Sequence, residues 1–218
     1  MKFPALATVA AIGLLAWAAY PVAFAGDARN VNAVNGSVEA SANQTYDTLS
    51  TVNGEVHVSR GATVGTAKTV NGEVEIESDA KVGTVSTVNG SLEVGEGATI
   101  THEASTVNGE LTLAQRSHVG GDVSTVSGEI GLKGAEVGGT VSTVNGDIEL
   151  TEGARVRGNL VVKRPNSGWN QHEGDPVKVH ICATCVVDGE LRFERPVELR
   201  VEKGAKIGKV VGDQVKRL

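Results

Sequence analysis

The chain has 218 residues, a formal net charge of −6, 28 glycines and only 3% aromatic residues. This composition provides little material for a globular core of large side chains, and it excludes a nucleic-acid-binding module, which needs a basic surface and stacking aromatics. A narrow core of small and β-branched side chains is compatible with it.

Residues 1–25 have the pattern of a secretory signal peptide. Lys2 precedes an uncharged run, rich in Ala and Leu, that ends in the small-x-small sequence of residues 23–25. The alternative is an uncleaved membrane anchor, because about 20 apolar residues span a bilayer, but two prolines in the run argue against it. We predict cleavage before Gly26 and an exported protein, in the periplasm or at the cell surface, with no transmembrane segment after cleavage.

Residues 26–161 are predicted to form solenoid coils, because the sequence Thr-Val-Asn-Gly or a close variant recurs every 18 or 19 residues. A fixed period in this range is typical of a solenoid, in which each coil packs only on its neighbours. The valines of the successive copies are Val34, Val52, Val70, Val88, Val107, Val126 and Val144.

Each copy continues with alternating apolar and polar residues, as in Glu55-Val56-His57-Val58. Alternation with period two predicts a short strand with one buried face. Two further apolar positions follow in each copy, so we predict three short strands per coil and almost no helix. The second positions are Val64, Val82, Ile100, Val119, Val137 and Val156, and the third are Ala67, Val85, Ala104, Val123, Val141 and Leu160.

The Asn-Gly pair predicts a bend, because Gly enters positive-φ conformations without a Cβ penalty and Asn tolerates the left-handed region. The pair also favours hairpins, but the next copy comes a whole coil later, which predicts parallel stacking at about 4.7–4.9 Å. Stacked amide side chains then hydrogen-bond along one column. Ser127 interrupts this column with a hydroxyl that keeps part of the bonding. The predicted ladder is Asn53, Asn71, Asn89, Asn108 and Asn145.

An acidic residue follows most Asn-Gly pairs. Paired carboxylates perform acid–base chemistry and stacked ones collect cations. We favour the plainer interpretation, outward strand starts whose repulsion is screened by solvent, and therefore predict no catalytic residues, no bound metal and no cofactor. The row consists of Glu55, Glu73, Glu110, Glu129 and Asp147, with Ser91 as its one break.

Residues 162–186 interrupt the repeat with prolines and glycines and predict a loop extruded from the solenoid. Within it, Trp169 with His172 and Arg164 forms a candidate contact surface for a ligand or partner, such as an envelope polysaccharide or protein. The alternative is that Trp169 folds back over an open coil. Residues 187–218 recover the motif and predict a final coil with a C-terminal cap.

Cys182 and Cys185 stand in this loop, and two cysteines of an exported protein usually form a disulfide. Positions i and i+3 of a straight strand face opposite ways, so the bond requires a turn at residues 183–184. The alternatives are reduced, packed thiols and a metal or redox site, with His180 and His172 as further zinc ligands.

Charge is distributed unevenly along the exported chain. Residues 26–154 hold six Lys or Arg against eighteen Asp or Glu, a net charge of −12, whereas residues 155–218 hold thirteen against eight, a net charge of +5. An acidic body with a basic end is compatible with end-to-end docking, or with approach to an anionic envelope surface; the plainer interpretation, a solvated surface with a weakly basic cap, is slightly favoured. Open solenoid ends are unpaired edges that associate unless they are capped.

The repeated Thr-Val-Asn-Gly-Glu/Asp-Val/Ile-x-Val/Ile/Leu resembles the adhesin β-solenoid families of bacterial surface and envelope proteins, including the head-domain type. The stretch Gly61-Ala62-Thr63-Val64-Gly65 is similar to bactofilins, the polymer-forming cytoskeletal proteins. The resemblance covers residues 33–161 and resumes at 187–211. It implies a right-handed β-helix without catalytic residues. The predicted signal peptide departs from the cytoplasmic bactofilin pattern and favours the envelope.

We therefore predict an all-β fold, a single-stranded parallel β-helix (β-solenoid) with 18–19 residues per coil, right-handed by resemblance. The alternative is a left-handed hexapeptide β-helix, because apolar residues from Val52 to Ile100 recur every six residues. The predicted function is a non-enzymatic structural or adhesive element of the bacterial cell envelope that self-associates through its ends. The rival is a carbohydrate-binding or metal-dependent envelope enzyme that uses the loop at 163–185.

Overall fold

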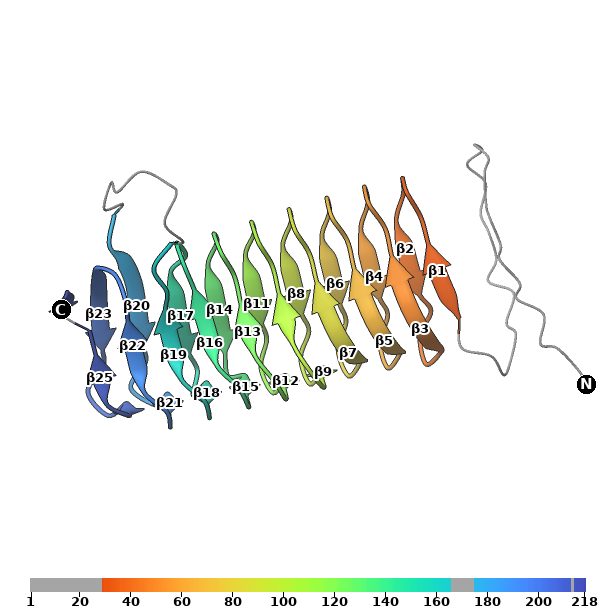
Figure 1. The fold of residues 1–218 in the computed structure, drawn as a ribbon. Coiled ribbons are helices and arrows are strands. Elements are labelled where there is room, and N and C mark those ends of the chain that lie inside the picture. Colours follow the sequence, from red (N-terminus) through yellow and green to blue (C-terminus); the bar gives the residue numbers. More distant parts are fainter. Residues whose placement is uncertain (1–28, 166–174, 213) are drawn as a thin grey trace, which may run out of the picture.

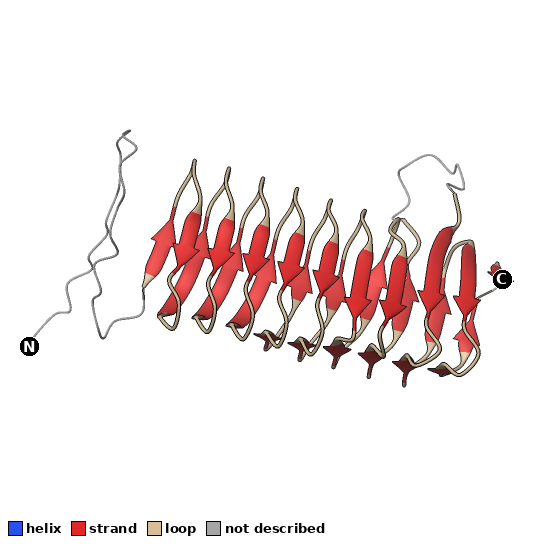
Figure 2. Cartoon of the chain, turned by 180° about the vertical axis from the view of Figure 1, so that it is seen from behind, coloured by secondary structure: helices blue, strands red, loops and turns tan. Residues whose placement is uncertain are grey.

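The computed structural model describes residues 29–165, 175–212 and 214–218. In these ranges every regular element is a β-strand, and the strands pair in parallel with those of the neighbouring coils. The coils stack in one row along an elongated body, without any helix among the described residues (Figure 1, Figure 2). The predicted all-β parallel solenoid is confirmed, whereas the predicted signal peptide, residues 1–25, lies outside the described residues.

One sheet takes a single strand from each coil and has ten strands in sequence order. Each strand buries the apolar residues of the alternating pattern, for example Val56 and Val58, and turns the residue between them outward. The strands are β2 (Val38–Ala40), β4 (Val56–Val58), β6 (Val74–Ile76), β8 (Leu92–Val94), β11 (Leu111–Leu113), β14 (Ile130–Lys133), β17 (Ile148–Thr151), β20 (Val177–Ile181), β23 (Val197–Val201) and β26 (Val215–Arg217).

The other sheet has sixteen strands and forms the rest of each coil's wall. Its first four strands are β1 (Asn30–Asn32), β3 (Thr45–Ser50), β5 (Thr63–Lys68) and β7 (Lys81–Ser86). Beyond β7 it divides into two rows. One row is β9 (Thr99–Ile100), β12 (His118–Val119), β15 (Glu136–Val137), β18 (Arg155–Val156), β21 (Val186–Val187) and β24 (Lys206–Ile207); the other is β10 (Ala104–Ser105), β13 (Val123–Ser124), β16 (Val141–Thr143), β19 (Leu160–Val162), β22 (Leu191–Phe193) and β25 (Val210–Val211).

The division follows from one inserted residue. In β7, Val82 and Val85 both face inward with two residues between them, whereas three residues separate Ile100 and Ala104 in the next coil. The additional residue opens the bend, so the strand that is continuous in β3, β5 and β7 becomes two strands. The predicted second and third strands are thus separate from β9 onward and joined before it.

The Thr-Val-Asn-Gly corner places threonine inside and valine outside. Thr51 is 2% exposed and its hydroxyl donates a 2.9 Å hydrogen bond to the carbonyl of Gly36 one coil earlier, whereas Val52 is 40% exposed. Thr69, Thr87 and Thr106 repeat this bond. A six-residue apolar spacing would require Val52 to face inward, so the hexapeptide pattern does not describe this interior.

The non-glycine residues with left-handed backbone lie at the turn opposite the Asn-Gly corner. This turn follows each strand of the ten-stranded sheet and contains, among others, Asn43 (φ 58°), Asp79 (φ 61°) and Arg116 (φ 57°). The Asn residues of the Asn-Gly pairs are not among the non-glycine residues with positive φ. At the predicted bend, positive φ is thus confined to the glycine, as at Gly36 (φ 108°) and Gly128 (φ 140°), and the Asn contributes its side chain.

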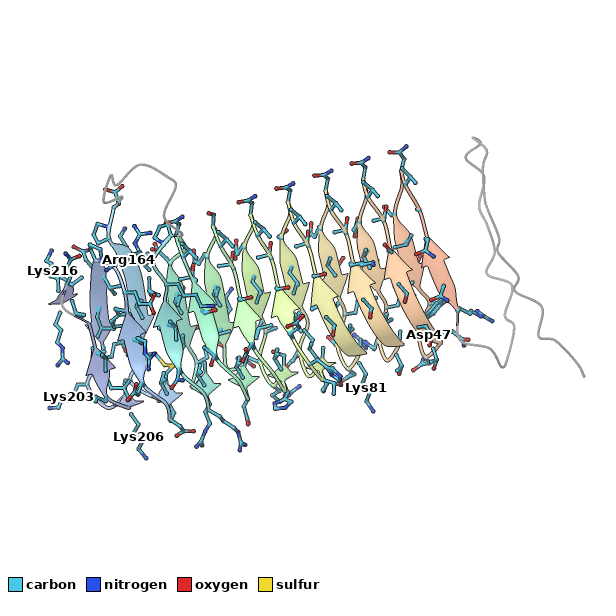
Figure 3. The ribbon with its side chains drawn as sticks, in the orientation of Figure 1. Asp47, Lys81, Arg164, Lys203, Lys206 and Lys216 are labelled. Carbon is cyan, nitrogen blue, oxygen red and sulfur yellow. A yellow bond between two sulfur atoms is a disulfide. The ribbon has the colours of Figure 1, made fainter. Side chains whose placement is uncertain are left out.

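The loop predicted for residues 162–186 is shorter than expected. β19 ends at Val162 and β20 begins at Val177, and β20 pairs with both β17 and β23 within the stack. Prolines and glycines interrupt the repeat only before Val177, after which alternating burial resumes. The solenoid therefore continues from Val177 rather than from Val187, to a C-terminal end where Lys203 and Lys206 lie (Figure 3).

Candidate functional site

The outer face of the ten-stranded sheet carries the molecule's main cluster of interacting titratable side chains. The acidic row predicted from the sequence lies at the strand starts; the side chain of Glu55, for example, is 45% exposed. A second column, which sequence reasoning missed, consists of the outward residue in the middle of each strand. From the second coil its first members are His57, Glu75 and Glu93, aligned by the parallel register.

Crowding of carboxylates on this face is visible at Glu73. Its partial burial disfavours the charged form, and the negative charges of Glu93, Glu55 and Glu75 act in the same direction. Together these effects raise the pKa of Glu73 above its ordinary value. The face thus favours a bound cation or a positively charged side chain, and a histidine stands at the centre of its most crowded part.

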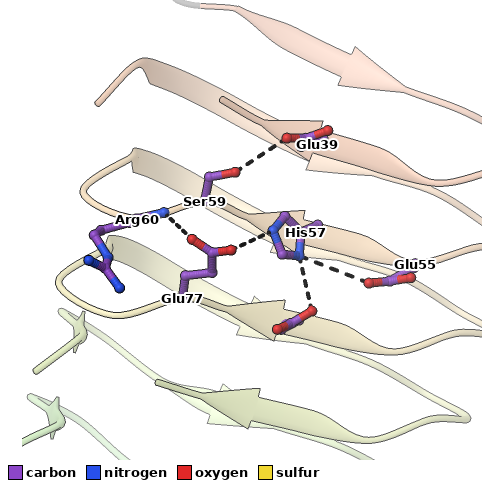
Figure 4. A network of polar contacts seen from close by, with 7 residues as sticks. Glu39, Glu55, His57, Ser59, Arg60 and Glu77 are labelled. Carbon is purple, nitrogen blue, oxygen red and sulfur yellow. Dashed lines mark hydrogen bonds and ion pairs between the residues drawn. The ribbon is translucent and has the colours of Figure 1, made fainter. Parts of the chain in front are cut away.

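His57 is surrounded by three carboxylates (Figure 4). Its Nδ1 lies 3.1 Å from Glu75 Oε2 and 4.0 Å from Glu55 Oε1, and its Nε2 lies 3.1 Å from Glu77 Oε1. Glu55 belongs to the same coil, two residues earlier, while Glu75 and Glu77 come from β6 and the residue after it. The alternation of the strand turns these side chains outward, and the 18-residue period places those of neighbouring coils side by side.

The orientation of the His57 imidazole is fixed by Glu77, which the backbone of Arg60 holds in place. Glu77 accepts a 2.7 Å hydrogen bond from the backbone N–H of Arg60 through Oε2, which leaves Oε1 for His57 Nε2. Because carboxylates only accept, Nε2 donates to Glu77, and Nδ1, which faces Glu75 and Glu55, donates to Glu75 when the ring is protonated. Burial disfavours the charged imidazolium, but hydrogen bonding and charge from Glu75 and Glu77 outweigh it and raise the pKa of His57.

The same arrangement recurs at His180 in β20. His180 Nε2 lies 3.0 Å from Glu202 Oε1, and Glu202 Oε2 accepts a 3.0 Å bond from the backbone N–H of Ala183, three residues after the histidine. His180 Nδ1 lies 3.4 Å from Glu149 Oε1. The two clusters differ at two positions. Lys178 stands two residues before His180 where Glu55 stands before His57, and Arg200 is paired with His180 in the next strand where Glu75 is paired with His57.

The predicted asparagine ladder forms over four of its five members and includes Asn35 as well. Each Nδ2 donates to the Oδ1 one coil earlier at 2.9–3.1 Å, from Asn53 through Asn108. Ser127 stays in the column through its backbone, but its hydroxyl makes no hydrogen bond among the described residues, contrary to expectation. Asn145 instead accepts a hydrogen bond from Arg195.

Of the predicted contact surface on the loop, only Arg164 is described; Trp169 and His172 lie outside the described residues. Arg164 bonds to the next coil, since its backbone N–H donates to Glu194 Oε2 and its Nε donates to the Glu194 carbonyl, both at 3.2 Å. Arg164 therefore holds the base of the loop against the next coil, and its backbone N–H and Nε are both used in these bonds.

Cys182 and Cys185 have sulfur atoms 2.13 Å apart, at disulfide distance. They close the turn between β20 and β21 predicted at residues 183–184, where Cys185 N–H donates to the Cys182 carbonyl at 3.0 Å. Cys185 occupies the fully buried position that Ala154 has one coil earlier. The bond thus reinforces a tight turn that every coil makes, and its sulfurs are not free to bind a metal in this state.

Comparisons of the chain with protein-family models, with curated proteins and with solved structures gave no match. Among the described residues, no helix is long and apolar enough to cross a membrane.

Proposed function

We propose that the chain is a non-enzymatic, exported β-solenoid that acts as a structural or adhesive element of the bacterial cell envelope and assembles end to end. The observation that carries this proposal is the exposed interior of the last coil. The edges of β24, β25 and β26 are paired on one side only among the described residues. Such edges accept a further strand.

The apolar side chains of that coil are incompletely covered. Ile207, Val210 and Val215 are half-buried. Their partners in the preceding coil, Val187, Leu191 and Val197, are at most 1% exposed. A further coil placed on this end would remove the remaining apolar surface from water, at about 25 cal/mol per Å².

Charge favours an acidic partner for this end. Lys203, Lys206 and Lys216 lie at the C-terminal end (Figure 3), and the preceding body of the solenoid is acidic, with a net charge of −12 over residues 26–154. Lysines on an edge strand oppose pairing with a similar, basic edge. The first coil of a second copy, where β1 and β2 are also paired on one side only among the described residues, satisfies the strand edge, and the acidic body behind it satisfies the charge.

The rival function, a carbohydrate-binding or metal-dependent envelope enzyme at the 163–185 loop, has one supporting observation. A polar hollow of about 380 Å³ beside the base of the loop is lined by Asn145, Asp147, Asp175, Lys178 and Arg195, among others. However, Arg195 already bonds to Asn145 and to the carbonyls of Val144 and Asp175. These groups hold the coils together, so we place the structural role first.

Sedimentation of the purified, exported chain over a series of protein and salt concentrations tests the proposal. We expect rods that lengthen with protein concentration and shorten as salt rises, because screening weakens the attraction between a basic end and an acidic body. Negative-stain images of each fraction would measure the rod length. A monomer at every concentration would contradict end-to-end assembly.

A further inference from the structure

The outer face of the ten-stranded sheet holds a set of ligand atoms arranged for a metal ion. One carboxylate oxygen each from Glu55 and Glu75 and one ring nitrogen of His57 all lie within 4.8 Å of one another. We propose that these three side chains bind one divalent transition-metal cation, and that the ion best matched to them is zinc. The site is separate from the C-terminal edge, so it does not depend on the proposed assembly.

The distances suit a small tetrahedral ion. Ligands bound to zinc at about 2.0–2.2 Å lie roughly 3.2–3.6 Å from one another. His57 Nδ1 is 3.1 Å from the Glu75 carboxylate and 4.0 Å from that of Glu55. Both carboxylate side chains are 45% exposed and free to adjust, and a shift of about 0.5 Å by Glu55 brings its oxygen to this separation from Nδ1. Solvent has access to a fourth position.

The histidine is oriented as a metal ligand rather than as a surface side chain. A ligating imidazole usually donates its other N–H to a carboxylate, which fixes the tautomer and directs the lone pair to the metal. Glu77 supplies this carboxylate at 3.1 Å from Nε2, and the backbone of Arg60 holds Glu77 in place at 2.7 Å. With Nε2 donating, the Nδ1 lone pair of the neutral ring faces Glu75 and Glu55, and a metal ion there takes the place of the proton that these carboxylates otherwise attract.

The ligand types favour zinc over calcium or magnesium. Calcium and magnesium prefer six or more oxygen ligands, including water, and do not select imidazole. Imidazole and carboxylate are both ligands that zinc accepts, and three protein ligands leave a fourth position open, as in other zinc sites with three protein ligands. The cysteines cannot supply thiolates while Cys182 and Cys185 are bonded to each other.

The second histidine cluster provides an internal comparison. His180 has the same supporting carboxylate, Glu202, and one carboxylate, Glu149, near Nδ1. Lys178 takes the place of the second carboxylate, so its ammonium repels a cation there. The two clusters thus share the carboxylate on Nε2 and differ at two further positions, because Arg200 also stands where Glu75 pairs with His57.

Isothermal titration of the metal-free, exported chain with zinc chloride, without reductant, tests the proposal. We expect one zinc per chain. His57→Ala and Glu75→Gln should each weaken binding at least tenfold, and Glu77→Gln should weaken it by about 10–100-fold, as is usual for a carboxylate that orients a ligand. His180→Ala should bind zinc like the parent, and calcium chloride should give no saturable uptake at these residues.

Failure to bind zinc stoichiometrically would overturn the proposal, and so would binding that survives His57→Ala or that is lost equally in His180→Ala. Circular dichroism and the thermal transition of each variant without zinc separate loss of a ligand from loss of the fold. If His57→Ala fails to fold, Glu55→Gln serves in its place, because it keeps the shape of the side chain and removes the charge. Unweakened zinc binding by Glu55→Gln would then count against the site.

Discussion

Replacement of Gly72 by alanine is expected to destabilise the solenoid by about 3 kcal/mol or more, the upper range for overpacking in a close-packed interior. A Cβ at Gly72 would lie 1.9 Å from the carbonyl oxygen and 2.6 Å from the carbonyl carbon of Gly54, one coil earlier. The obstacle is backbone, so no side chain can rotate away. The coils would have to separate, which breaks hydrogen bonds such as that from Gly54 N–H to Asn71 O at 3.0 Å.

Gly131→Ala is the matched control, because it adds the same methyl group where there is room. Its Cβ would meet only Thr112 Oγ1, at 3.6 Å, an ordinary contact. Since alanine restricts the unfolded chain, this variant should be neutral or up to about 1 kcal/mol more stable than the parent. Urea unfolding followed by circular dichroism measures both. Equal stability of the Gly72→Ala variant and the parent would contradict the close coil contact.

The second large effect is expected at the centre of the stack. Leu111 in β11 is fully buried and pairs with β8 on one side and β14 on the other. Leu111→Ala should cost about 2–5 kcal/mol, because the cavity lies between two coils that cannot both collapse into it. Each coil is stabilised by its neighbours, so the loss should also broaden the unfolding transition.

The control for Leu111 lies four residues earlier in the same coil. Val107 is 37% exposed, so Val107→Ala should change the free energy of unfolding by no more than about 0.5 kcal/mol. The comparison also tests which corner residues face outward. A cost at Val107 as large as that at Leu111 would mean that the valine of the Thr-Val-Asn-Gly corner is inside.

The sequence spacing was sufficient to predict the apolar columns of the coil walls. Ala67 and Val85, for example, are 18 residues apart and are paired in adjacent strands, because a stacked coil converts a sequence period into a spatial neighbour. The corner was harder to predict. Valine is β-branched and apolar, so the pattern favours it for the core, but only the Thr51 hydroxyl can satisfy the Gly36 carbonyl inside the turn.

The histidine site could have been predicted in part. His57 stands between two inward valines and 18 residues before Glu75, so the same period that places the core also places these side chains together. The position of Glu77 on Nε2, fixed by the backbone of Arg60, depends on the shape of the following turn, which spacing does not determine. Similarly, the alternation of Val177–Ile181 indicates a strand, but the loop composition before it concealed that this strand belongs to the stack.

The most direct test of end-to-end assembly is sedimentation of a Val210→Pro variant beside the parent at low salt. Leu191 N–H bonds to the Lys209 carbonyl at 2.9 Å, so, by the alternation of a parallel ladder, the N–H of its partner Val210 points to the free edge. Proline removes this donor and blocks the edge, whereas Val210→Thr keeps it. We predict rods for the parent and for Val210→Thr and a monomer for Val210→Pro; rods of parental length from Val210→Pro would contradict assembly through this edge.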